Sequence, residues 1–550
     1  MTTRFGFALA AAELGLVLVA GCTSSSGDHG SDTSVAGALT GASAGASVSG
    51  GVGVVGAGSA GMPSTPAGGS PAGTSNGGSP GAGPGGSAGA VSVVGGAGSG
   101  EQFVSGVTVT VSKLVSTILI VTWTQTKAAD QTWLEFSFAG SSVMTSRPQA
   151  GALGAHRDVV LGVPGSTAAT VRVVSKLAGV ENKTNDYSGT TGAVPSGMPK
   201  PTVSMYDATL ASPDRWLLGA VENSGTCTDD SCYFNGKWWL YIIDRQGRVV
   251  WYYADAASND VSSFPHAARD GEYLFVEKRA FSTSGTPSVL KFTLDRETYN
   301  QAVQVPLLSD AVDMTDDGSL LYDTEERDRG NAELREMDRQ GKVRTIWNCD
   351  DAFASVPNFL CYSNTVTWDK PSDSVLLSFP EMDTVAQIDR KTGALMATYG
   401  AAAGSYAFSP APWSFVWQHY ANITPQGTLL VSSHLPKFTK DSPAGPHQHA
   451  FEEFEIDRAN KRLVQKWVYG DAQADGAEWA LSRGMALKLG NGNLLVNYGT
   501  GGVIRELTPD KKTVFLVKFD VSGANDYFGK LVGHNFTLDD LYALNGGGPK

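Results

Sequence analysis

The sequence is poor in histidine and cysteine, with eight and five among its 550 residues, and it has no block of basic residues. Its formal net charge is −13, whereas nucleic-acid-binding proteins present a clustered positive surface, so we expect no nucleic-acid partner. An anionic substrate would therefore require a local cationic pocket. After the first 20 residues no apolar run is long enough to cross a bilayer.

The N-terminus has the pattern of an export signal. Arg4 precedes an apolar run from Phe5 to Ala20, and the small residue Gly21 comes directly before Cys22. A basic start, an apolar stretch and small residues before a cleavage point are typical of a segment removed on export. The ending resembles a bacterial lipobox, in which Cys22 becomes the lipidated first residue. An ordinary signal peptide with an incidental cysteine is the alternative.

We therefore expect a lipoprotein signal peptide over residues 1–21. The mature protein is expected to be extracytoplasmic, in the periplasm or at the cell surface. Lipid at Cys22 would anchor it to the bacterial cell envelope. Residues 22–100 are almost entirely Gly, Ser, Ala and Pro with scattered Val, a composition that cannot bury a core. This segment is predicted to be a disordered tether, which would span about 50 Å as a flexible coil.

The other four cysteines fall into two close pairs. Because an exported chain sits where disulfides persist, we expect bonds between Cys227 and Cys232 and between Cys349 and Cys361. A metal site is the alternative, but no CxxC pair is present. The sequence therefore predicts disulfides here and no metal.

Residues 101–200 contain short β-rich runs with turn residues between them, such as "GVTVTVS", "ILIVTWTQ", "TWLEFSF" and "ATVRVVSKL". Strands at this spacing are typical of an immunoglobulin-like β-sandwich of about 100 residues. Helical periodicity is absent from this stretch.

Residues 201–550 contain six similar units. Each has an apolar strand after a Gly or Asp turn, then a strand that ends in Asp-Arg or an equivalent turn, then an outer strand, as in "WWLYIIDRQGRVVWYY". Repeated antiparallel units of this kind indicate propeller blades. We therefore predict an all-β protein with a six-bladed β-propeller, in which residues 203–220 complete the last blade.

Propeller geometry points to His419. In a propeller the inner strands line a central channel, and His419 stands eight residues before the turn glycine Gly427. The same count gives Asp310 before Gly318, and Gly484 before Gly492 with Arg483 beside it. In the fourth blade the corresponding segment, "CYSNTVTWDKPSDS", places Tyr362 and Asn364 at this point, so these four residues are the candidate neighbours. A satisfied structural histidine is the alternative reading of this position.

Other histidines fit a functional site less well. His266 stands five residues before its turn glycine and is thus out of register with His419, which favours a structural or surface role. His434, His447 and His449 have a spacing that could bind zinc. They fall in a Pro/Gly-rich segment between two strands of the fifth blade, so we expect a solvated loop.

Four motifs occur in a fixed order within the repeats: "DRQGRVVWYY", "NTVTWDKPSDSVLLS" with "VAQIDRKTGALMATYG", "QHYANITPQGTLLV", and "LGNGNLLVNYGTGGVIRELTPDKK". Together they resemble the bacterial arylsulfate sulfotransferase family over about residues 203–545, and the preceding sandwich resembles that family's N-terminal domain. The resemblance implies a cofactor-free enzyme that uses no nucleotide sulfate donor.

The resemblance also implies a mechanism and a nucleophile. A histidine takes the sulfuryl group from a phenolic sulfate ester and then passes it to another phenol. His419 stands at the position of that nucleophile, Gln418 precedes it as in the family, and Asn364 matches an asparagine of the fourth-blade motif. Neutral imidazole is a good nucleophile near neutral pH, and hydrogen-bond donors must stabilise charge on the sulfuryl oxygens.

The sequence departs from the family in three places. The third-blade motif reads Ser309-Asp310 where the family has adjacent histidines, Tyr362 replaces a histidine, and Pro380 follows the strand where the family has an arginine. Loss of one such donor commonly lowers the rate by about 10²–10³. Arg483 and Tyr362 are candidates to compensate. The alternatives are thus a working sulfotransferase, a decayed propeller that serves as a binding or envelope protein, and a different enzyme at the channel mouth. The oligomeric state is not predicted.

Overall fold

The computed structural model describes residues 103–223, 237–254, 260–261, 265–280, 287–324, 332–410, 414–434, 449–470, 484–520, 529–530 and 535–550. The expected signal peptide, tether, Cys22, Cys227 and Cys232 lie outside the described residues. Among the described residues, no helix is both long and apolar enough to cross a membrane.

The first described region is a pair of antiparallel sheets. One sheet contains β1 (Val104–Val111), β2 (Leu119–Gln125) and β6 (Gly154–Val160). The other contains β3 (Ala129–Phe138), β4 (Met144–Thr145), β5 (Gln149–Gly151), β7 (Ala168–Leu177), β8 (Val180–Lys183) and β9 (Tyr187–Thr190). Strand β2 alternates buried and less buried residues, which is the pattern of a strand with one face in a core.

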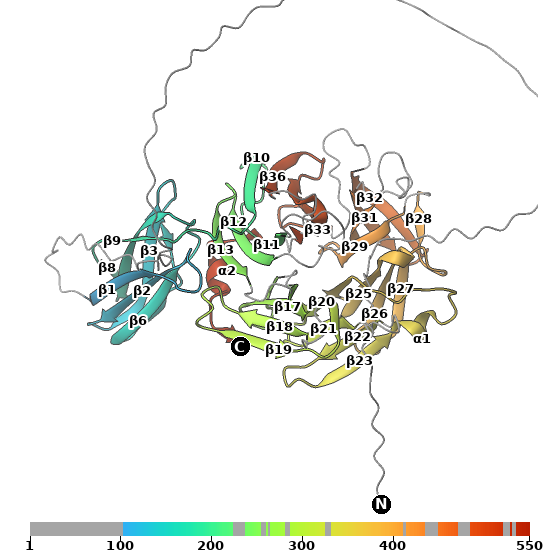
Figure 1. The fold of residues 1–550 in the computed structure, drawn as a ribbon, viewed down its shortest axis with the longest axis horizontal. Helices are drawn as coiled ribbons and strands as arrows, with labels where there is room; N and C mark the ends of the chain where they lie inside the picture. The colour runs from blue at the N-terminus through green and yellow to red at the C-terminus, as the bar shows by residue number, and fades with distance from the viewer. Residues whose placement is uncertain are drawn as a thin grey trace, which may run out of the picture. The chain divides into compact units, whose positions relative to one another are not determined.

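Among the described residues from 200 onward, six successive sheets are the blades, which Figure 1 labels along the chain from green to red. Blade 1 contains β11 (Trp216–Asn223), β12 (Lys237–Asp244) and β13 (Val249–Ala254). Blade 2 contains β14 (Asp260–Val261), β15 (His266–Ala267), β17 (Leu274–Ala280), β18 (Ser288–Phe292) and β19 (Asn300–Gln304). Blade 3 contains β20 (Leu308–Met314), β21 (Leu320–Thr324), β22 (Glu333–Met337) and β23 (Val343–Asn348).

Blade 4 contains β24 (Thr365–Asp369), β25 (Ser374–Phe379), β26 (Thr384–Asp389) and β27 (Leu395–Gly400). Blade 5 contains β29 (Val416–Ile423), β30 (Leu429–His434), β31 (His449–Asp457) and β32 (Arg462–Tyr469), and β28 (Ala407–Ser409) pairs in parallel with β32. Blade 6 contains β33 (Met485–Lys488), β34 (Leu494–Asn497), β35 (Val503–Leu507) and β36 (Thr513–Asp520). This arrangement confirms the predicted all-β class and the six-bladed propeller.

The turn glycines explain why the blades share one register. Gly318, Gly427 and Gly492 all have positive φ and each donates a backbone hydrogen bond to the residue three positions earlier. Glycine adopts this left-handed backbone without steric cost. In blade 4 the same place is taken by Asp373, whose φ is 49°. Counting back from these turns therefore reaches equivalent points on the inner strands.

Ring closure differs in detail from the sequence prediction. β10 (Lys200–Tyr206) does pair with β36 at the outer edge of blade 6, and Figure 1 shows the two side by side. β11, however, belongs to blade 1. Its inner partners come from the far end of the chain, namely β37 (Gly529–Lys530) and β38 (Asn535–Phe536). The C-terminal segment thus supplies the inner edge of the first blade.

Short elements follow these closing strands. α2 (Leu538–Ala543) begins at Thr537, whose side chain accepts a hydrogen bond from the backbone of Asp540, and β39 (Gly548–Pro549) pairs with β16 (Gly271–Glu272). Leu541 belongs to a core shared by the sandwich and blade 1.

Two single-turn helices and one more helix occur within the blades: η2 (Pro380–Met382), η3 (Gly499–Gly501) and α1 (Cys349–Phe353). Cys349, the first residue of α1, forms a disulfide with Cys361 across a Cα–Cα distance of 5.7 Å. The bond therefore ties the end of blade 3 to the segment that leads into blade 4.

Candidate functional site

His419 lies in a bulge of the inner strand of blade 5. Strands β29 and β30 pair regularly from Tyr420 onward, but the register shifts between Val416 and Tyr420, so Trp417, Gln418 and His419 are set out of the ladder. Trp417 has a φ of 46°, a left-handed conformation that is uncommon for a large side chain. Bulges of this kind re-aim side chains and often adjoin active sites.

Blade 4 holds this bulge in place. The buried side-chain amide of Gln418 donates to the carbonyls of Phe379 at 3.0 Å and Thr384 at 2.9 Å. The backbone N–H of Trp417 donates to Asp383 Oδ1 at 2.8 Å. Burial raises the pKa of Asp383, and the hydrogen bond from Trp417 opposes that rise. The backbone before His419 is therefore fixed by side chains and carbonyls of the neighbouring sheet.

Asn364 takes part in the same arrangement. Its Nδ2 donates to the carbonyl of Gln418 at 3.0 Å, and the hydroxyl of Ser378 donates to that same oxygen at 3.3 Å. Asn364 is itself buried, and its backbone N–H donates to the Ser378 carbonyl. The structure thus brings Asn364 to the peptide directly before His419, where it positions the bulge. Its predicted contact with substrate stays a prediction.

Blade 3 has a comparable bulge at Asp310. The register of β20 against β21 shifts between Leu308 and Val312, so Asp310 lies in a bulge as His419 does. The buried Asp323 accepts from the backbone N–H of Ala311 at 2.9 Å and from the hydroxyl of Ser363 at 2.7 Å. Asp323 therefore links the blade 3 bulge to the segment before blade 4.

The other two predicted neighbours of His419 are Tyr362 and Arg483. Tyr362 is half-buried beside Ser363, in the segment that enters blade 4. Arg483 lies outside the described residues, although Gly484, which follows it, is described. A side chain on Gly484 would meet His449 and Ser432, so this position of blade 6 packs closely against blade 5.

A second group of inner-strand residues was not identified from the sequence. Asp313 stands five residues before Gly318, and Trp368 stands five before Asp373. Arg269 Nη2 lies 3.5 Å from both carboxyl oxygens of Asp313, and its guanidinium lies 5.0 Å from the ring centre of Trp368. Burial raises the pKa of Asp313, and Arg269 opposes that rise. Asp313 and Trp368 each stand five residues before the turn residue of their blade, and this shared spacing could have identified the group from the sequence.

Tyr420 is electrostatically coupled to this group. Burial raises the pKa of the Tyr420 hydroxyl, the charge of Asp313 adds to the rise, and Arg269 opposes it. Tyr420 directly follows His419 in β29. An arginine, a carboxyl group and a phenol from blades 2, 3 and 5 thus act on one another electrostatically, and the phenol belongs to the residue after His419. His266, which has the same five-residue count, stacks on Phe275 with ring centres 4.9 Å apart.

The histidines of the fifth blade are not in a solvated loop, so that expectation was wrong for two of them. His434 ends β30, His449 begins β31, and the two are paired in register and buried. His449 Nε2 lies 2.7 Å from the hydroxyl of Ser432. The strands extend further than the Pro/Gly composition suggested, because these polar side chains are accommodated inside the sheet. His447 lies outside the described residues.

No group of three or more His, Cys, Asp or Glu side chains within the described part of the chain is arranged to hold a metal ion.

The match with a known family covers this part of the molecule. Residues 361–523 match the arylsulfotransferase (ASST) family. The matched segment runs from Cys361 through blades 4, 5 and 6 and includes Tyr362, Asn364, His419 and Arg483. The resemblance seen in the sequence is confirmed over this segment, which is arylsulfotransferase-like.

No curated protein matches the sequence. Among solved structures, a virginiamycin B lyase from Staphylococcus aureus has 10% identity and a TM-score of 0.33, and the match covers 60% of this chain and 99% of that one. A functionally unknown protein from Desulfotomaculum acetoxidans has 10% identity, a TM-score of 0.35, and coverage of 66% and 96%. A putative 6-phosphogluconolactonase from Bacteroides fragilis has 11% identity, a TM-score of 0.32, and coverage of 71% and 98%. Likeness at this level says nothing about what this chain does.

Proposed function

We propose that the protein transfers a sulfuryl group from a phenolic sulfate ester to a second phenol, with His419 as the nucleophile and without a nucleotide donor. The observation that carries the proposal is the fixed bulge at His419, which lies inside the segment that matches the arylsulfotransferase family. A nucleophile must be held at one angle to its target, and Asn364 and Gln418 provide such a hold.

The reaction has two displacement steps. In the first, a neutral imidazole nitrogen of His419 attacks the sulfur, a nitrogen–sulfur bond forms, and the sulfur–oxygen bond to the aryl group breaks to release a phenolate. In the second, the oxygen of an acceptor phenol attacks the same sulfur, the nitrogen–sulfur bond breaks, and the acceptor's proton passes to solvent or to the released phenolate. His419 returns to its starting state, so no oxidant, reductant or cofactor is consumed.

Charge on the sulfuryl oxygens requires donors, and in this proposal Arg483 and Tyr362 supply them. Tyr420, the residue after His419 in β29, and Arg269, which acts on it electrostatically, are further candidates for this role. Asp310 would repel a sulfate ester in its ionised form. We therefore propose a slow transfer or a donor with an unusual shape.

A decayed propeller that binds rather than transfers is the second candidate. The observation that favours it is the buried Asp383, whose carboxyl group accepts from Trp417, two residues before His419. In its ionised form, which burial disfavours, this carboxyl group would oppose the approach of an anionic ester. In this alternative the channel mouth binds a neutral or cationic molecule.

Incubation of the purified protein with a chromogenic aryl sulfate and a phenol acceptor separates the two candidates. The transferase releases the chromogenic phenol at a rate that depends on the acceptor, and His419→Ala abolishes this release while the circular-dichroism spectrum stays unchanged. Equal release by the variant, or none by the native protein, contradicts the proposal.

We also propose that lipid at Cys22 anchors the protein outside the cytoplasm, since small residues precede this cysteine and a flexible composition follows it. Cys22→Ser should move the protein from the membrane fraction to the soluble fraction after cell disruption. An unchanged membrane fraction for this variant would rule out the lipid anchor.

A further inference from the structure

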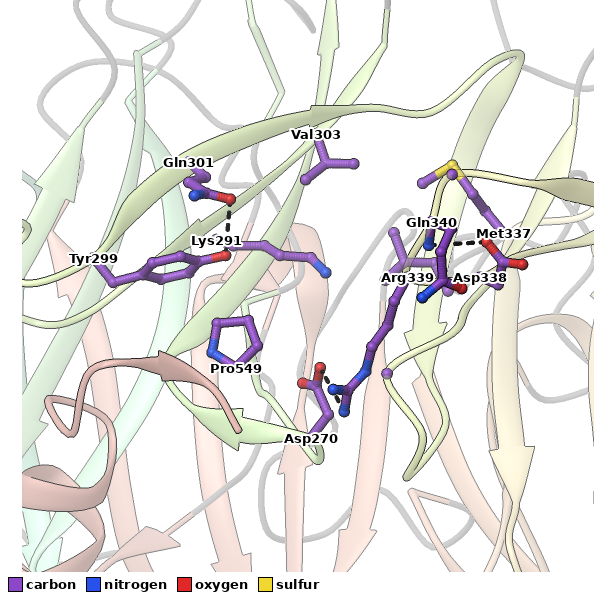
Figure 2. A pocket seen from close by; sticks show the side chains of 13 residues that line it. Asp270, Lys291, Tyr299, Gln301, Val303, Met337, Asp338, Arg339, Gln340 and Pro549 are labelled. Carbon is purple, nitrogen blue, oxygen red and sulfur yellow. Dashed lines mark hydrogen bonds and ion pairs between the residues drawn. The ribbon is translucent and has the colours of Figure 1, made fainter.

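A cavity that opens to solvent lies between blades 2 and 3 and the C-terminal Pro549, and its lining includes none of the His419 region. It has a volume of about 410 Å³, within the range of small-molecule sites. Figure 2 shows Tyr299, Gln301 and Val303 on one side and Arg339 and Met337 on the other. None of its lining residues belongs to the candidate sulfotransferase site, so what it binds does not depend on the proposed function.

A lysine without an ion pair points into this cavity. Lys291 lies in the middle of β18, on the strand face where Val289, two residues earlier, packs into the core between the blades. Its exposed fraction is 9%. Within the described residues its amine makes no hydrogen bond or ion pair, and its one aromatic contact is with the Tyr273 ring, whose centre lies 5.8 Å from Nζ. Figure 2 shows the amine directed into the space between Val303, Pro549 and Arg339.

A buried lysine in this state is costly, because its ammonium group loses hydration and gains only a long contact with the Tyr273 ring. Burial lowers the pKa of Lys291, and the nearby Asp270 only partly offsets that effect. The carboxyl group of Asp270 is already engaged, since it accepts from Tyr273 at 2.6 Å and forms an ion pair with Arg339 at 3.4 Å. Because Asp270 is already engaged, the ammonium group of Lys291 is available to a bound anion.

Hydrogen bonds and close packing hold the Arg339 side of the cavity wall in place. Arg339 also donates to the carbonyl of Asp317 at 2.6 Å and to that of Lys550 at 2.9 Å. Gly318, with a φ of 81°, makes room for this arrangement, because any side chain there would collide with Asp270 and Arg339. Asp338 also lines the cavity, but its carboxylate accepts from two backbone N–H groups of its own turn.

The remaining wall is largely apolar and can pack against a hydrophobic group of a ligand. Val303, Leu320, Met337 and Pro549 contribute hydrocarbon surface. At one side the hydroxyl of Tyr299 donates to Gln301 Oε1 at 3.1 Å, so the Gln301 amide nitrogen stays available as a donor beside the lysine. One cation, one amide donor and an apolar wall are the features that recognise an acid group on a hydrophobic body.

We propose that this cavity binds a small organic anion, one that carries a single carboxylate on an apolar body about the size of one ring, with the carboxylate on the Lys291 amine. Inorganic anions lack the apolar body, and neutral analogues lack the charge. The site should therefore bind a small organic carboxylate more tightly than either an inorganic anion or a neutral analogue.

Benzoate is the probe for this site, with benzamide as its neutral analogue and inorganic sulfate as a plain anion. Acetic anhydride labels accessible amines, and mass spectrometry reads the label at Lys291. Benzoate should protect Lys291 from acetylation at concentrations at least tenfold below those needed with benzamide or sulfate. The same protection should persist in His419→Ala, which separates this cavity from the sulfotransferase site.

Calorimetric titration with benzoate gives the matched variant test. Lys291→Met should weaken binding by about 10- to 100-fold, because a hydrogen bond to a charged group is lost. Lys113→Met, at an exposed sandwich position, should bind like the native protein. Lys291→Met should also unfold at the same or a higher urea concentration than the native protein, since a buried unpaired charge has been removed.

Three results would overturn the proposal: no protection of Lys291 by benzoate, equal protection by benzamide, or equal protection by inorganic sulfate. Unchanged benzoate affinity in Lys291→Met would also do so.

Discussion

At the scale of single residues, burial gives Asp158 an unusual protonation. Asp158 on β6 accepts from the Ser146 hydroxyl at 2.5 Å and from the backbone of Val159, yet burial outweighs both contacts and raises its pKa from 3.8 to about 6. The charged form is therefore disfavoured in the folded protein. The stability that protonated Asp158 contributes is fully present below about pH 4 and is lost as the pH rises through 6.

Asp158→Asn should remove this pH dependence. The variant should be as stable as the native protein at pH 4 and more stable at pH 7.5, by up to about 3 kcal/mol for a shift of roughly two pKa units. Urea unfolding at the two pH values measures the difference. Asp350→Asn, at an exposed position, is the control and should show no such change. An equal gain at both pH values would contradict the assignment to Asp158.

At the scale of elements, the β29 bulge depends on side chains of blade 4. Asn364 binds the carbonyl of Gln418, one residue before His419, whereas Thr367 binds the carbonyl of Ala421, two residues after it, at 2.8 Å. Both are side-chain contacts from the same segment to the same strand. They differ in which part of β29 they hold.

Asn364→Ala should lower the rate of sulfuryl transfer by about 10²-fold, because a small misplacement of a reacting group has an effect of that size. Thr367→Val, which removes the other contact, should lower it much less. Each change should cost about 1 kcal/mol of stability through one lost hydrogen bond. Transfer rates and urea unfolding of both variants provide the comparison. Similar rates in the two variants would show that the bulge does not position His419.

The sequence predicted the elements better than the contacts between them. The turn glycines Gly318 and Gly427 are local signals, and counting from them placed Asp310 and His419 at equivalent bulges. The Asn364–Gln418 contact joins residues 54 positions apart and has no local signal. The position of His434 in a strand was also missed, because the apparent loop composition hid a buried polar pair.

At the scale of the whole molecule, blade 1 depends on the C-terminal segment. β37 and β38 pair with β11, and the buried Leu541 of α2 packs into the core that the sandwich shares with blade 1. Tyr542 donates from its hydroxyl to the carbonyl of Val159 at 2.8 Å. The same segment therefore closes the ring of blades and connects it to the sandwich.

Leu541→Ala should destabilise the protein by about 2–5 kcal/mol, the usual cost of truncating a buried leucine. Removal of residues 529–550 should be more severe and prevent cooperative unfolding, because an inner strand is lost as well. Leu360→Ala, at a position that is 54% exposed, is the control and should change stability by less than about 0.5 kcal/mol. Native-like urea unfolding of the truncated chain would contradict this account of closure.

A covalent intermediate on His419 is the sharpest test of the proposed sulfuryl transfer. Rapid quenching of the protein with excess aryl sulfate in the absence of acceptor, followed by proteolysis at alkaline pH and mass spectrometry, locates any transferred sulfuryl group. The account predicts a sulfuryl group on His419 that disappears when a phenol acceptor is added before the quench. Transfer activity with no modification of His419, or with the group on another residue, would contradict it.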